Sequence, residues 1–71
     1  MLVLLEENTI VKNCNGDDYK VIKVSYPYTL FYNIKKDEYV KGAYVKQYDD
    51  GIEWMYGKYY GNDLEYALSC F

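Results

Sequence analysis

Short runs of apolar and β-branched residues alternate with polar turn signals along most of the chain. These runs predict five strands, at residues 9–14, 19–25, 29–34, 39–48 and 52–60. Asn15-Gly16, between the first two runs, is a strong hairpin signal. Pro27 fixes its own φ and turns the chain before the third run. Because the connections are short, we expect neighbouring strands to pair antiparallel as a meander.

The C-terminal residues change to helical spacing. Gly61 ends the fifth run, Asn62 is a suitable N-cap, and Glu65 is placed as its capping-box partner. The apolar side chains that follow form one short stripe: Leu64, Ala67, Leu68 and Phe71. The predicted fold class is therefore α+β: a five-stranded antiparallel β-meander, with strong curvature left open, and a short C-terminal α-helix packed on one face.

Two regions of the pattern are irregular. Val40, Ala43 and Val45 can share one face of the fourth run only if the pairing slips at Gly42, which predicts a β-bulge there. Residues 1–8 are compatible with an additional strand, an extension of the first strand or a short helical turn.

Both faces of the predicted sheet carry large apolar or aromatic side chains. A helix of about nine residues covers one face at best, so we expect the other face to stay accessible and to bind a partner. The side chains assigned to this aromatic surface are Phe31, Tyr44, Tyr48, Met55, Tyr59 and Tyr60. A register error of one residue would exchange the inward and outward groups.

The composition argues against catalysis. The 71 residues suffice for a single domain, 1–71. The chain has no histidine, which excludes Ser-His and Cys-His nucleophiles, and its 5 glycines form neither a phosphate loop nor a dinucleotide fingerprint. Cys14 and Cys70 fit no metal or redox spacing, and reduced thiols are favoured over a disulfide. We therefore expect a non-enzymatic protein without catalytic residues, cofactor or metal.

Paired carboxylates are the remaining candidates for a chemical site. Most of the pairs lie in expected turns, where aspartate is favoured for backbone reasons, and no spacing resembles a calcium loop. An up-and-down meander brings the turns at 15–18 and 35–38 and the helix start at 62–65 to one end. The turn carboxylates assigned to the partner surface are Asp37, Glu38, Asp49 and Asp50. Such a rim would attract a basic protein surface, notably one that holds nucleic acid.

Other kinds of partner stay open. Aromatic residues on a sheet can stack single-stranded bases, and five strand lysines could bind phosphate: Lys20, Lys23, Lys41, Lys46 and Lys58. The net charge of −3 and the absence of arginine argue against nucleic acid. A self-complementary aromatic face would instead make a homodimer or an accessory subunit of a larger complex.

The N-terminus indicates no targeting segment. Met1 to Leu5 are apolar, but Glu6 and Glu7 end the run before it reaches the length of a secretory or transmembrane segment. We expect a soluble, cytoplasmic protein without a membrane partner.

The chain is biased towards Lys, Asn, Tyr and Ile, lacks Arg and His, and has a length that looks complete from Met1. In these respects it resembles the small stand-alone proteins of phages and mobile elements of A/T-rich bacteria, among them anti-CRISPR-type inhibitors. The resemblance covers the whole chain and includes no specific motif, so it assigns no residue a role. It implies an inhibitor whose acidic surface occupies a nucleic-acid-binding cleft of a host protein.

Overall fold

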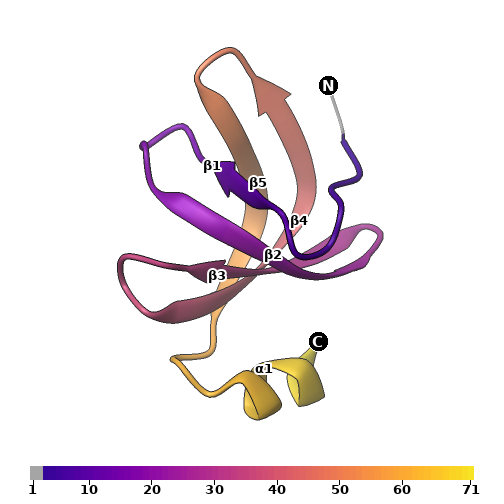
Figure 1. Ribbon diagram of the computed structural model, residues 1–71. Coiled ribbons are helices and arrows are strands. Elements are labelled where there is room, and N and C mark those ends of the chain that lie inside the picture. Colours follow the sequence, from indigo (N-terminus) through magenta and orange to yellow (C-terminus); the bar gives the residue numbers. More distant parts are fainter. Residues whose placement is uncertain (1–2) are drawn as a thin grey trace.

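The computed structural model describes residues 3–71, which form one antiparallel sheet and one helix (Figure 1). The elements are β1 (Ile10–Lys12), β2 (Asp18–Ser25), β3 (Tyr28–Asn33), β4 (Glu38–Tyr48), β5 (Gly51–Tyr59) and α1 (Leu64–Cys70). The spatial order of the strands is their order in the sequence. The predicted five-stranded meander with a short C-terminal helix is thereby confirmed.

The sheet curls until its first and last strands meet. Asn13, directly after β1, forms a parallel bridge with Ile52 of β5, and the Cys14 amide donates to the Ile52 carbonyl at 3.1 Å. The Val3 amide donates to the Val45 carbonyl of β4 at 3.0 Å. Figure 1 shows β1 passing beside β5 after the chain has travelled round the sheet. The sheet therefore has a concave inner side and a convex outer side.

The inner side holds the main core. Phe31 has no exposed surface, and the strand register places Val21 and Val40 beside it on the neighbouring strands. The Trp54 indole stacks on the Phe31 ring with centroids 4.3 Å apart, and Tyr19 meets the indole edge-on at 5.0 Å. The expectation that Phe31 belongs to an accessible surface is wrong, because curling turns the face opposite the helix into the interior.

Helix α1 packs on the outer side of the sheet, as a second and smaller cluster shows. Leu30 of β3 and Ala67 of α1 are fully buried in this cluster together with Tyr60, which is 7% exposed. The expectation that Tyr60 lies at the surface is therefore also wrong. The N-cap is Asp63 and not the predicted Asn62, since the Asp63 carboxylate accepts the Tyr66 amide hydrogen bond at 3.1 Å.

The N-terminal segment is neither the strand nor the helical turn considered from the sequence. Residues 3–9 carry no regular secondary structure, and Met1 and Leu2 lie outside the described residues. The Asn8 amide donates to the Val21 carbonyl at 2.7 Å, and the Val21 amide donates to the Thr9 carbonyl at 2.8 Å. Asn8 and Thr9 thus lie along the edge of β2 as an irregular continuation of β1, whereas Val3 reaches β4.

β4 is irregular as predicted, but its extra residue lies between Ala43 and Lys46 and not at Gly42. The register places Ala43 on the outer side, so the expectation that it shares a face with Val40 and Val45 is wrong. The register between β4 and β5 shifts on both sides of Ala43, and Tyr44 adopts a positive φ of 55°. The shift lets Val40 and Val45 enter the same core cluster, although strict alternation would place residues five positions apart on opposite faces. Gly42 lies directly against the Trp54 indole, and a Cβ atom at this position would overlap the ring.

The contact between Gly42 and Trp54 yields a stability prediction. Gly42→Ala should lower the free energy of unfolding by about 2 kcal/mol, because the added methyl must displace an indole that is stacked in the core. Urea denaturation followed by tryptophan fluorescence measures the change.

Gly57→Ala is the matched control for this prediction. A Cβ atom at Gly57 would meet the same indole no closer than 3.5 Å, which is an ordinary contact. We expect a change of less than about 0.5 kcal/mol there. Equal losses at the two positions would contradict the proposed packing.

Candidate protein-binding surface

Exposed aromatic side chains gather on the outer side of the β4–β5 hairpin. Tyr28 of β3 pairs with Ala43 of β4, which pairs with Met55 of β5, so Tyr28 and Met55 share one row across the sheet. Leu30 lies two residues from Tyr28 and packs under α1, which identifies this face as the outer one.

Three more tyrosines join this row. The bulge turns Tyr44 outward, and its amide donates to the Pro27 carbonyl at 2.9 Å, which ties β4 to the β2–β3 turn. Tyr26, from that turn, packs edge-to-face with Tyr44 at 6.4 Å. Tyr48 also lies on the outer side, nearer the hairpin tip. Glu53 is two residues from Met55 and shares its face, Lys46 pairs with Glu53, and Tyr48 is two residues beyond Lys46 on β4.

We call these side chains the aromatic hairpin face: Tyr26, Tyr28, Tyr44, Tyr48 and Met55. Each is between 40% and 60% exposed. Large apolar groups at this exposure, side by side on a paired hairpin, are typical of an interaction surface rather than of a core. The face is held by strand pairing and by the Tyr26–Tyr44 contact, so a partner would meet an ordered surface.

The structure brings together only part of the surface predicted from the sequence. Tyr44, Tyr48 and Met55 lie together, whereas Tyr59 pairs with Val40 and therefore lies on the inner side, at its open end. Two members of the aromatic hairpin face, Tyr26 and Tyr28, were missed. The signal for Tyr28 was its position two residues before Leu30, because side chains two positions apart on a strand lie on the same face.

Lysines border the aromatic hairpin face. Lys23 pairs with Leu30, Leu30 pairs with Lys41, and Lys41 pairs with Lys58, so three lysines share one row across four strands. The Lys41 ammonium lies 4.8 Å from the centre of the Tyr28 ring. Lys46 lies on the same side, opposite Glu53. Lys20 lies on the outer side too, because it pairs with Tyr32, which is two residues from Leu30 and shares its face. All five lysines considered for phosphate binding therefore lie on the outer side.

The acidic residues occupy the turns instead. Asp37 and Glu38 lie at the β3–β4 turn, and Asp49 and Asp50 form the tip of the β4–β5 hairpin beyond Tyr48. Of the carboxylates assigned to the partner surface, only those at the hairpin tip directly adjoin the aromatic hairpin face. The acidic and aromatic parts of the predicted surface are thus largely separate.

The expected clustering of turns at one end is confirmed by hydrogen bonds. The Ile34 amide donates to the Asp18 carbonyl at 3.2 Å, which joins the β3–β4 and β1–β2 turns. The Asn62 amide group, before α1, donates to the Asp37 carboxylate at 3.1 Å, and the Tyr32 hydroxyl donates to its other oxygen. The hydrogen bonds from Tyr32 and Asn62 lower the pKa of Asp37. The hydrogen bond between Tyr32 and Asp37 also raises the pKa of the Tyr32 hydroxyl.

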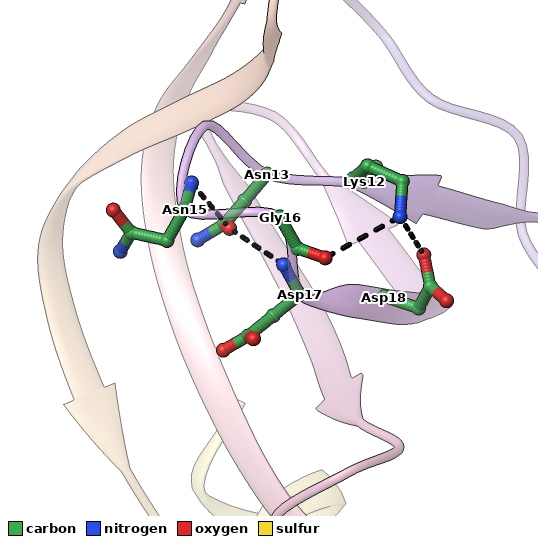
Figure 2. A network of polar contacts seen from close by, with 6 residues as sticks. All are labelled: Lys12, Asn13, Asn15, Gly16, Asp17 and Asp18. Atoms are coloured by element: carbon green, nitrogen blue, oxygen red, sulfur yellow. Dashed lines mark hydrogen bonds and ion pairs between the residues drawn. The ribbon is translucent and has the colours of Figure 1, made fainter.

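The β1–β2 turn uses its polar residues for its own structure (Figure 2). Asn13 is 4% exposed, and its side-chain oxygen accepts hydrogen bonds from the backbone amides of Asn15 and Asp17 at 2.9 and 3.3 Å. The Lys12 ammonium forms an ion pair with Asp18 at 3.1 Å. The Asn13 side chain thus stabilises the turn, and the Asp18 carboxylate is used in an ion pair across its ends.

One open hollow lies beside the hairpin tip. It measures ≈ 390 Å³ and is lined by Val11, Lys12, Gln47, Asp49, Asp50, Gly51 and Ile52. Near this tip, burial and then the neighbouring Asp50 raise the pKa of Cys14, which favours its uncharged thiol. Cys14 and Cys70 are both free. Within residues 3–71, no three Cys, Asp or Glu side chains are grouped so as to hold a metal ion.

Comparison with known proteins yields no relative for this chain: no family model matches it, and no curated protein or solved structure is significantly similar. Over the part of the chain that the structure describes, no helix is long and apolar enough to cross a membrane.

The contacts of Asp37 predict a pH-dependent stability. Its folded-state pKa lies below the ordinary value of 3.8, so the ionised carboxylate stabilises the fold above that value, and this contribution is lost as pH falls through the folded-state pKa. Asp37→Asn should therefore lower Tm near neutral pH, and the difference from wild type should shrink in acid. Thermal unfolding as a function of pH measures both effects.

Asp49→Asn removes the same charge at the hairpin tip and serves as the control for net charge. The substitution at Asp37 keeps a side chain that tolerates its positive φ of 53°. A Tm difference for Asp37→Asn that stays constant down to strong acid would contradict the contact with Tyr32 and Asn62.

Proposed function

We propose that this domain is a non-catalytic protein-binding module whose contact surface is the aromatic hairpin face. The observation that carries the proposal is the exposure of four tyrosines and a methionine on one side of a paired hairpin. Tyrosine suits such a surface, because it buries a large area on binding, loses little conformational entropy and offers a hydroxyl for hydrogen bonds.

The arrangement of the rings supports contact with protein more than stacking with bases. The Lys41 ammonium occupies one face of the Tyr28 ring, and Tyr26 and Tyr44 already meet edge-to-face. Base stacking requires an open ring face. The partly exposed tyrosines, with their apolar rings and hydroxyl groups, suit the polar and apolar mixture of a protein interface.

The narrower function implied by the compositional resemblance, inhibition of a host nucleic-acid-handling protein, calls for an acidic contact surface. The aromatic hairpin face is bordered by both signs of charge: lysines adjoin it, Glu53 lies opposite Lys46 on the same side, and Asp49 and Asp50 adjoin it from the tip. The geometry of this face therefore supports protein binding in general and adds no support for that inhibitor function.

Truncation of the aromatic hairpin face tests the proposal. The triple substitution Tyr28→Ser, Tyr48→Ser and Met55→Ser should abolish capture of a binding protein from an extract of the source cells, because it removes the large side chains at which binding energy concentrates. Cross-linking followed by mass spectrometry identifies what wild type captures, and circular dichroism checks that the variant is folded.

A matched control carries Tyr59→Ser, Leu64→Ser and Tyr66→Ser, which are equally exposed positions outside the aromatic hairpin face. The control should capture the same protein as wild type. Capture that survives the first triple substitution and fails in the control would place the binding surface elsewhere.

A second candidate function, binding of single-stranded nucleic acid, is favoured by the row formed by Lys23, Lys41 and Lys58. It predicts that oligothymidylate binds at low salt and that the logarithm of affinity falls linearly with the logarithm of salt concentration. Fluorescence anisotropy measures this dependence. With a net charge of −3 and no arginine, we expect no binding even at low salt.

A further inference from the structure

We infer that the partner of the aromatic hairpin face is an acidic polypeptide segment, recognised by the tyrosines together with Lys41, Lys46 and Lys58. This inference rests on the proposed protein-binding function and specifies the chemistry of the partner. It reverses the charge expected from the sequence, where acidic turns were to meet a basic surface.

Two lysines of like charge face each other at this border. Lys41 and Lys58 are directly opposite each other on β4 and β5, an arrangement that destabilises a sheet. Each ammonium lies over a ring, Lys41 over Tyr28 at 4.8 Å and Lys58 over Tyr60 at 5.8 Å. These contacts offset part of the repulsion and hold the two charges at the border of the aromatic hairpin face. A carboxylate from a partner would relieve the remainder.

Lys41, Lys46 and Lys58 form no ion pair among residues 3–71. The ion pair found there joins Lys12 to Asp18, in a different turn. Glu53 lies opposite Lys46 in the register, but no ion pair joins the two. The lysines that border the aromatic hairpin face are therefore available to an anionic ligand.

The distribution of charge limits the size of the ligand. The net charge is negative, and acidic turns lie at the strand ends, to either side of the lysine row that runs across the strands. A long polyanion that extends past the row would meet these carboxylates, whereas a short acidic segment can stay within the basic area. Apolar side chains between the Asp and Glu residues of such a segment would pack against the tyrosines.

Selection from a random peptide display library tests the inference on the whole chain. Peptides that bind wild type but not the Tyr28→Ser, Tyr48→Ser, Met55→Ser variant should be rich in Asp and Glu beside apolar residues. The double substitution Lys41→Gln and Lys58→Gln should weaken their binding about tenfold, since each exposed charge pair contributes up to about 1 kcal/mol. The loss should be smaller at high salt.

Lys35→Gln with Lys36→Gln is the control, because it removes the same charge in the β3–β4 turn, away from the aromatic hairpin face. This control should bind the selected peptides within twofold of wild type. Equal losses in the two double variants would show attraction by net charge alone and overturn the inference.

The remaining outcomes separate the inference from the proposed function. Selected peptides that are neutral or basic, and that still need the tyrosines, would overturn the acidic partner and leave protein binding intact. Tyrosine-dependent binding of oligothymidylate that is tighter than that of any selected peptide would assign the face to nucleic acid. A library that yields no tyrosine-dependent peptide would overturn both proposals.

Discussion

The contact between Trp54 and the backbone at Gly42 is the interaction on which the rest of the structure depends. The indole lies against β4 where a side chain is missing, and it stacks on Phe31 at the centre of the concave side. A flat sheet of this composition would expose one aromatic face to water. Curling around the indole encloses that face and lets Asn13 reach Ile52, so a small domain gains an interior without a second layer.

The same closure determines what remains for binding. The inner side is filled by the core, and α1 covers Leu30 on the outer side. The outer side of the hairpin therefore keeps a group of exposed aromatic side chains, although other large apolar residues, such as Leu4 and Tyr59, are exposed elsewhere. The bulge at Tyr44 contributes directly, because it allows Val45 to face inward while Tyr44 contacts Tyr26. Core formation and the candidate binding surface thus arise from one irregularity in β4.

Local signals predicted a large part of this architecture. The strand boundaries agree with the structure to within one or two residues. A bulge in β4 was predicted from the spacing of Val40, Ala43 and Val45, although Ala43 lies on the outer side. Tyr48 and Met55 were found because they alternate with inward residues, whereas the outward position of Tyr44 depends on the bulge. Phe31 and Tyr60 were misplaced, since their burial depends on which side the sheet curls toward and on which side α1 packs.

By itself, the sequence determined the order of strands, the turns and the terminal helix, because hairpin residues, alternation and helical spacing act over a few neighbouring positions. It could not decide which of two similarly apolar faces becomes the interior. That choice comes from contacts between residues far apart in the chain, such as Trp54 with Phe31 and Asn13 with Ile52. Only the tertiary structure therefore separated the aromatic hairpin face from the core and placed a row of lysines at its border, beside the acidic hairpin tip.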